Sequence, residues 1–372
     1  MFDIEIFAHT HKLMSNTKAS QLLNMVKPSK LLVPIVIGLG AASYMLFRNF
    51  DSNAFQKISW TWLTSYWLLL AFFMVVVRDF SYMWRIRILT DKELNWRKCF
   101  EVIMLWEFAS AIAPAILGGG FAFAILIINK EKISFGKSIS VVMFTSFLDG
   151  LFFAIVAPLV YFTAGREGLF SNLNAEAVQQ LAHGKELYYT FWIIYFTILA
   201  YKLVIAYALF INAHAVKQLL EKIFSFKFLH KWKHSATETG EEMVIAANEL
   251  KGKKINYWLK SFTATCLSWS ARFIIINCII MAFSTISFNH FLLYARQVVM
   301  GILMIGSPTP GGSGVAEIMF SNFLGEFIDN KSLTSSLALL WRLISYYPYI
   351  FIGAIVLPRW VKRVFAKEEI TK

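Results

Sequence analysis

Residues 308–317 read Pro-Thr-Pro-Gly-Gly-Ser-Gly-Val-Ala-Glu and interrupt an otherwise apolar run at 291–328. A second apolar run, 102–129, is interrupted at 114–122, which read Pro-Ala-Ile-Leu-Gly-Gly-Gly-Phe-Ala. Proline removes a helical hydrogen bond and glycine loosens the backbone, so both runs are expected to unwind midway. Unwound backbone at membrane depth is tolerated only where protein or water covers it. The predicted break residues are Pro114, Gly118, Gly119, Gly120, Pro308, Pro310, Gly311, Gly312 and Gly314.

The composition of the chain excludes an ordinary soluble protein. Of its 372 residues, 57% are hydrophobic and only 16% are charged, and the mean hydropathy is +0.56. Soluble domains contain about 25% charged residues, because a surface that faces water needs them. The basic residues lie between apolar runs and do not form one basic face, so no nucleic-acid partner is expected. We therefore expect an integral membrane protein.

The remaining apolar runs are long enough to cross a bilayer as single helices. About 20 apolar residues span the hydrocarbon core, and helices satisfy their own backbone polar groups there. The fold class predicted is an all-α polytopic membrane protein with about six crossings, at 31–47, 60–77, 137–162, 187–211, 259–286 and 333–357.

The distribution of Lys and Arg predicts how the two interrupted runs are oriented. We take the N-terminus as cytoplasmic and expect basic loops on that side. The basic segments 78–101 and 212–259 both fall inside only if 102–129 enters and leaves the membrane as a re-entrant hairpin. The same reasoning makes 291–328 a hairpin from the opposite side and leaves the C-terminus cytoplasmic. Within 212–259, the basic amphipathic stretch 214–234 is predicted as a helix at the cytoplasmic interface.

Two halves of similar layout follow from this reading. Residues 1–186 and 187–372 each contain about three crossings and one re-entrant hairpin, in opposite orientations. This is an inverted repeat of the kind found in transporters.

The residues at 308–317 resemble the signature of the transmembrane, flippase-like domain of lysylphosphatidylglycerol synthases and their stand-alone relatives. Weaker similarities are Pro114 with the Gly118–Gly120 triplet, the helix that carries Asp149, and the Arg-containing stretch 341–347. Many family members have Glu and then Arg after the first glycine element, where this chain has Phe-Ala-Phe-Ala from Phe121.

Members that synthesise lysylphosphatidylglycerol carry a cytoplasmic aminoacyl-transferase domain after the membrane part, and this chain stops at Lys372. The resemblance therefore implies a stand-alone protein of the cell inner membrane that moves a lipid or a lipid-linked molecule between leaflets without making it.

Charged side chains inside the apolar runs are the candidate functional residues, because each costs at least about 2–3 kcal/mol at membrane depth. An arginine fork suits phosphate, and tyrosines could line a path for a headgroup. The alternative is that the charges only pair and hold the repeats together, for example Arg342 with Glu317 or Arg272 with Asp149. We expect Lys202 to extend toward the interface. The predicted substrate-path residues are Arg272, Arg296, Arg342, Glu317, Asp149, Glu107, Tyr346 and Tyr347.

The expected function is translocation of a phospholipid or of a lipid-linked anionic molecule. A small-solute or ion-coupled secondary transporter of the same architecture is the alternative. An enzyme is not expected, because no His or Cys constellation is visible, and neither a cofactor nor a metal is expected. Membrane lipids are the expected partners, with a homo-oligomer possible, and movement is either passive or coupled to an ion through Asp149 or Glu107. Lysylphosphatidylglycerol, another phospholipid and a polyprenyl-linked sugar stay open as substrates.

Overall fold

The computed structural model describes residues 60–112, 120–170, 184–225, 233–305, 307, 309, 311–312 and 314–370. The predicted crossing at 31–47 lies outside these residues, as do the break residues Pro114, Gly118, Gly119, Pro308 and Pro310. All regular elements within the described ranges are helices.

Five helical stretches are long and apolar enough to cross a membrane, and they match five of the predicted crossings. They include α4 (Trp62–Leu89), α7 (Phe135–Phe170), α9 (Gly184–Phe210) and α12 (Ile255–Phe283). The fifth stretch comprises α15 (Thr334–Ser345) and α16 (Tyr347–Ile370). Their length and apolar composition confirm a polytopic, integral membrane protein.

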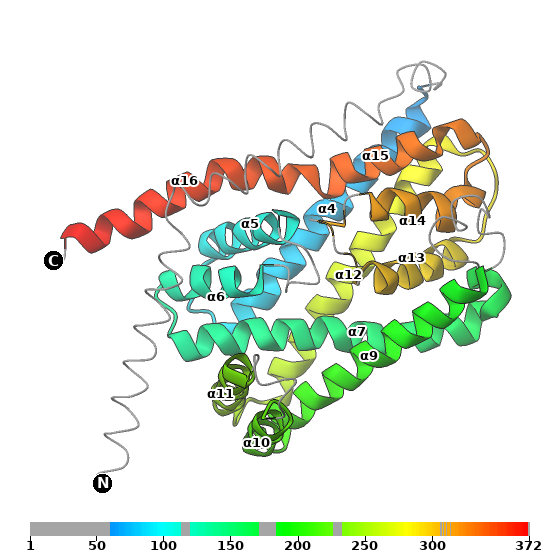
Figure 1. Cartoon of the computed structure of the whole chain (residues 1–372). Coiled ribbons are helices and arrows are strands. Elements are labelled where there is room, and N and C mark those ends of the chain that lie inside the picture. Colours follow the sequence, from blue (N-terminus) through cyan, green and yellow to red (C-terminus); the bar gives the residue numbers. More distant parts are fainter. Residues whose placement is uncertain are drawn as a thin grey trace, which may run out of the picture.

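Helices α4 and α12 lie side by side along their length at the centre of the bundle (Figure 1). Helices α5 (Trp96–Ile112) and α6 (Phe121–Lys130) lie on one side of this pair. Helices α13 (His290–Ile305) and α14 (Val315–Leu324) lie on the other side. Helix α5 packs against α16, and α13 packs against α7. The first helix of each interrupted run therefore contacts the long helix that ends the other half of the chain.

Each interrupted run folds back on itself as a pair of helices. In the first pair, Lys98 near the start of α5 lies 3.2 Å from the carboxylate of Glu131, directly after α6. In the second pair, Arg296 on α13 donates to the carbonyl of Phe323 in α14 at 3.0 Å. The same arginine lies 2.9 Å from Glu326, just beyond α14. Both ends of each run therefore meet, whereas the depth that each pair reaches in a membrane stays a prediction.

The helix at the crossing predicted for 60–77 is much longer in the structure. Helix α4 continues past Val77 to Leu89, so Arg78 and Arg85 belong to a buried helix face and not to a basic loop. Arg78 and Arg85 share this face because their spacing is two helical turns.

The crossing predicted at 333–357 is not continuous, since Tyr346 has non-helical dihedral angles (φ −130°, ψ −57°) between α15 and α16. Pro348 lacks the N–H that would bond the carbonyl of Ile344, which favours a break there.

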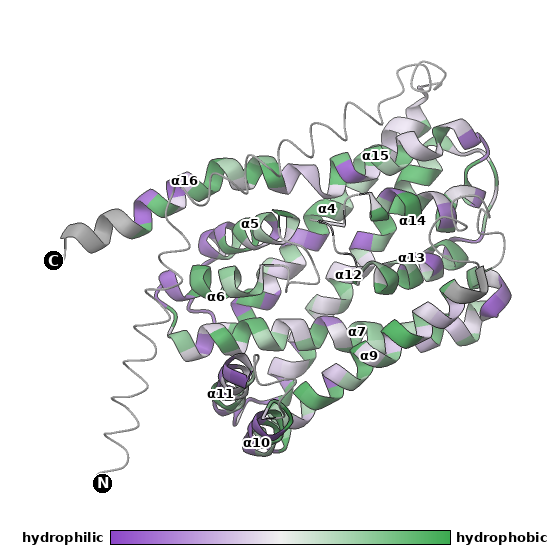
Figure 2. Ribbon diagram, viewed as in Figure 1, coloured by the Kyte–Doolittle hydropathy of each residue, from purple (hydrophilic) through white to green (hydrophobic). Residues whose placement is uncertain are grey.

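The described residues between 212 and 259 form two helices before α12 begins, and the first ends at Ile223, so the prediction of one helix over 214–234 is wrong. Helix α10 covers Ala213–Ile223 and α11 covers Lys233–Leu250. Asn212 begins α10, because its side chain accepts from the backbone N–H of Ala215 at 2.9 Å. Figure 2 shows both helices to be rich in hydrophilic residues, in contrast to the mainly apolar long helices.

Gly353 allows α5 and α16 to pack closely, which gives a test of this contact. A Cβ atom at Gly353 would lie 2.3 Å from Cγ of Phe108 on α5. Gly353→Val should therefore lower stability by about 1–3 kcal/mol through overpacking, measured as the thermal unfolding midpoint in detergent. Ile355→Val, at a side chain that is 56% exposed, serves as the control and should change little. Equal effects of the two variants would contradict this packing.

Asp91, in the connection between α4 and α5, gives a pH-dependent test. Partial burial acts to raise the pKa of its carboxyl, but hydrogen bonds from Lys137 and Lys253 outweigh this and lower the pKa. A depressed folded-state pKa means that the carboxylate stabilises the protein above about pH 4, and that this stabilisation is lost as pH falls through the lowered pKa. Asp91→Asn should be less stable than wild type at pH 7, by no more than about 1 kcal/mol, and the difference should shrink below pH 4. A constant difference across this range of unfolding measurements would refute the assignment.

Candidate functional site

A polar cavity of about 250 Å³ lies among α4, α5, α7 and α12. Its walls are unusual for the interior of a membrane protein, because they carry two arginines, two carboxylates and several aromatic rings. The side chains of Glu107, Asp149 and Arg272 are 23%, 29% and 33% exposed, so a ligand in the cavity could contact all three. The polar and aromatic lining residues are Tyr82, Arg85, Trp106, Glu107, Ser110, Thr145, Asp149, Trp269 and Arg272.

Asp149 joins three helices at one end of this cavity. Nη1 of Arg85 on α4 lies 2.6 Å from Oδ1 of Asp149 on α7 and also donates to Thr265 on α12 at 3.1 Å. The indole N–H of Trp269 donates to the same Asp149 oxygen at 3.0 Å. These contacts neutralise both charges, which removes most of the cost of burying them.

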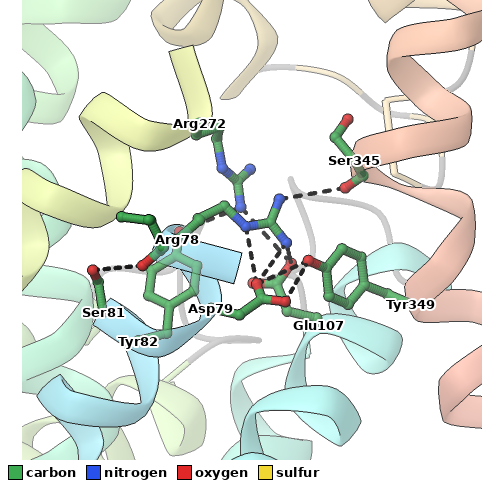
Figure 3. A network of polar contacts seen from close by, with 9 residues as sticks. Arg78, Asp79, Ser81, Tyr82, Glu107, Arg272, Ser345 and Tyr349 are labelled. Atoms are coloured by element: carbon green, nitrogen blue, oxygen red, sulfur yellow. Dashed lines mark hydrogen bonds and ion pairs between the residues drawn. The ribbon is translucent and has the colours of Figure 1, made fainter. Parts of the chain in front are cut away.

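Glu107 on α5 lies between two arginines at the other end (Figure 3). Its Oε2 atom is 3.8 Å from Arg78 on α4 and 3.7 Å from Arg272 on α12. Arg78 also donates twice to Asp79 at 3.1 Å, and the Tyr349 hydroxyl lies 2.8 Å from both Asp79 oxygens. The network thus ties α4 and α5 to α16.

The charges of the cavity and of the adjoining network balance. Three arginines (Arg78, Arg85 and Arg272) face three carboxylates (Asp79, Glu107 and Asp149). The structure brings together the predicted residues Arg272, Glu107 and Asp149. The suggested pairing of Arg272 with Asp149 is wrong, because Asp149 pairs with Arg85 and Arg272 lies nearest to Glu107.

A second cluster lies where the two interrupted runs meet. Arg342 pairs with Glu317 at 3.3 Å, the pairing that the sequence suggested. The Glu317 carboxylate also accepts from the backbone N–H of Gly314 at 2.7 Å and so caps α14. The guanidinium of Arg342 lies 3.6 Å from the centre of the Tyr346 ring. The polar groups of this cluster therefore interact with one another.

Tyr346 touches both interrupted runs. Its hydroxyl donates to the carbonyl of Ala111, the residue next to the end of α5, at 2.9 Å. Its ring lies so close to Gly311 that a Cβ there would be 2.3 Å from ring atoms. Gly311 also has φ +55°, which glycine adopts readily. Neither Tyr346 nor the buried Tyr347 lines the cavity, so the structure connects them with packing between the halves.

Two further intramembrane cations are held by the protein itself. Arg296, which is 1% exposed, donates to the carbonyl of Gly168 at 2.8 Å in addition to its contacts with α14. Lys202 donates to the carbonyl and the hydroxyl of Ser146 on α7, both at 2.8 Å. The expectation that Lys202 extends toward the interface is therefore wrong, because a partner on the neighbouring helix is within reach.

Sequence reasoning missed Arg78, Asp79, Arg85 and Tyr349. Arg78 and Arg85 continue the buried face of α4 that contains Ala71. This helical spacing was the signal that could have found them. Among the described residues, no group of three or more His, Cys, Asp or Glu side chains is arranged to hold a metal ion.

The pair of Arg85 and Asp149 can be tested by a double-mutant cycle. Arg85→Met or Asp149→Leu alone leaves an opposite charge without its partner and should cost about 3 kcal/mol of stability. The double variant should cost less than the sum of the two, because neither charge remains. Unfolding in detergent measures the effect, and Arg97→Met, at a side chain that is 89% exposed, is the control. Additive losses would mean that the two residues do not interact.

Comparisons with known proteins agree with a membrane protein. A family profile described as "Lysylphosphatidylglycerol synthase TM region" matches residues 31–353. A protein of Archaeoglobus fulgidus described as "UPF0104 membrane protein" is 25% identical over 346 residues, which is 89% of this chain and 98% of that protein. No solved structure shows a significant match. The profile match spans most of the chain, and the protein therefore belongs to the lysylphosphatidylglycerol synthase transmembrane-region family.

Proposed function

We propose that this protein moves a lipid that carries an anionic headgroup between the two leaflets of the cell inner membrane. The observation that carries the proposal is the charged cavity among α4, α5, α7 and α12, surrounded by apolar helices. A headgroup in this cavity would exchange its hydration shell for protein dipoles and charges, while the acyl chains stay in lipid. The membership of the family of the transmembrane region of lysylphosphatidylglycerol synthases supports a lipid as the substrate.

We further propose that the two helix pairs are re-entrant hairpins of an inverted repeat, with both termini cytoplasmic. The reciprocal packing of α5 on α16 and of α13 on α7 supports this layout. Tyr346 supports it as well, because one side chain contacts Ala111 and Gly311, each beside one of the two breaks. Movement of one half against the other would then expose the cavity to each leaflet in turn.

Two buried clusters would have to loosen alternately during such movement. At the base of the first helix pair, Glu131 is 5% exposed and contacts Arg363 on α16. The indole N–H of Trp360 on α16 donates to the same carboxylate at 2.8 Å. At the base of the second pair, Arg296 binds Glu326 and the carbonyl of Gly168 near the end of α7. Each cluster ties one helix pair to the other half, and we assign them as the inner and the outer gate.

A small zwitterionic solute is the alternative ligand, because the charges around the cavity balance. In that case the protein is a secondary transporter that needs no lateral access to the bilayer. Neither function requires covalent chemistry or a cofactor in this cavity.

Narrowing the cavity without changing its charge tests the proposal. Thr145 lines the cavity and is 5% exposed, so Thr145→Leu fills part of the space. We expect at least about a tenfold slower transbilayer movement of headgroup-labelled phospholipid in proteoliposomes, as for loss of about 1.4 kcal/mol of transition-state stabilisation. Thr197→Leu, on an exposed part of α9, is the matched control and should retain the rate. Solute flux without lipid movement in wild type would refute lipid translocation.

Labelling of single cysteines tests the topology. With Cys99, Cys266 and Cys278 replaced, Arg97→Cys and Lys132→Cys should react with an impermeant reagent from the same side of the membrane. Asn289→Cys and Asp329→Cys should react from the other side. Labelling of Arg97→Cys and Lys132→Cys from opposite sides would show that 102–129 crosses the bilayer.

A further inference from the structure

We infer that Arg272 is the receptor for a phosphate group in the cavity and that Glu107 is its displaceable counter-ion. This inference rests on the proposed function only in taking the cavity as the ligand site. It names the chemical class that the site recognises, a phosphate mono- or diester, and the residue that recognises it.

The three arginines of the network differ in their exposure and in how many of their N–H donors have acceptors within the protein. Arg78 is 1% exposed and donates to Asp79 and to the carbonyl of Ser345. The side chain of Arg85 is 6% exposed and lies 2.6 Å from Asp149. Both guanidinium groups therefore already have close acceptors within the protein.

Arg272 is more exposed than Arg78 and Arg85, and it has no carboxylate of the described chain within hydrogen-bond distance. Its side chain is 33% exposed, and its nearest carboxylate oxygen, on Glu107, is 3.7 Å away. That distance is too long for a hydrogen bond. One terminal nitrogen donates to the Tyr82 hydroxyl at 3.3 Å, and the buried Nε atom has no hydrogen-bond partner among the described residues. Arg272 therefore retains donor capacity that the protein does not use.

The orientation of the Arg272 guanidinium suits an oxyanion. The group lies 5.0 Å from the centre of the Trp269 ring, whose contact limits the rotation of the side chain. A planar guanidinium presents its N–H donors at its edge, where two of them can bind two oxygens of one phosphate. A phosphate bound in this way would replace the distant contact with Glu107 by close charged hydrogen bonds.

Glu107 allows this exchange without leaving a buried carboxylate unpaired. Its Oε2 atom lies at nearly equal distances from Arg78, 3.8 Å, and Arg272, 3.7 Å. When phosphate occupies Arg272, Glu107 keeps Arg78 as its partner. In the empty cavity, Glu107 partly neutralises Arg272 and competes with any anion. Removal of its charge should therefore strengthen phosphate binding.

Binding to the purified, full-length protein in detergent tests the inference by calorimetry. The probes are dihexanoylphosphatidylglycerol, glycerophosphoglycerol, which has the same headgroup without chains, and dihexanoylglycerol, which has no phosphate. We expect Arg272→Gln to weaken binding of the phosphate probes by about tenfold or more, as for loss of hydrogen bonds to a charged group. Arg272→Lys should fall between Arg272→Gln and wild type, and Glu107→Gln should bind severalfold more tightly. Arg97→Gln, at an exposed arginine outside the cavity, should bind as wild type does.

The probes also identify the source of the phosphate. Preference for dihexanoylphosphatidylglycerol over glycerophosphoglycerol indicates a lipid headgroup, and the reverse preference indicates a soluble phosphate ester. Wild-type affinity in Arg272→Gln, weaker binding in Glu107→Gln, or equal binding of dihexanoylglycerol would each overturn the inference, as would failure of both phosphate probes to bind. A thermal unfolding midpoint for each variant shows whether it is folded.

Transbilayer assays on the same variants separate this inference from the proposed function. Lipid movement in wild type combined with unchanged phosphate binding in Arg272→Gln would refute the receptor and leave translocation standing. Phosphate binding that depends on Arg272, combined with no lipid movement in wild type, would refute translocation and leave the phosphate receptor standing.

Discussion

The structure depends on one constraint, which is that arginines within an apolar bundle must find acceptors inside the bundle. Arg78 and Arg85 lie on the buried face of α4, and each is held by a carboxylate. Because an uncompensated charge in such a place costs several kcal/mol, these pairs determine which helices can be neighbours. The acceptors come from α4 itself, α5 and α7, while Tyr349 adds α16.

The cavity lies beside these pairs, among α4, α5, α7 and α12. Glu107, Asp149 and Arg272 line it, and each has a side chain of opposite charge within 4 Å. Aromatic rings such as Trp269 complete the walls and provide N–H donors or π faces to the charged groups.

The interrupted runs contribute in a different way. Tyr346 contacts a described residue of each run, through a hydrogen bond to Ala111 and through close packing on Gly311. Contacts at the bases of the helix pairs connect each pair to the other half of the chain. In the proposed movement of one half against the other, these contacts would break and form as units.

The sequence by itself determined the class of protein, the positions of five described crossings and the two interrupted runs. Hydropathy and Pro/Gly content are local properties, and the lipid solvent makes them decisive, because backbone groups must pair within each helix. The pairing of Arg342 with Glu317 was also predictable, because Glu317 directly follows one break and Arg342 lies on the next helix.

Only the tertiary structure decided that Asp149 binds Arg85, that Glu107 lies between Arg78 and Arg272, and that Tyr346 contacts both Ala111 and Gly311. Charge partners in a helical bundle depend on crossing angles and on the rotation of each helix about its axis. Those quantities come from the packing of all helices together, and no local stretch of sequence contains them.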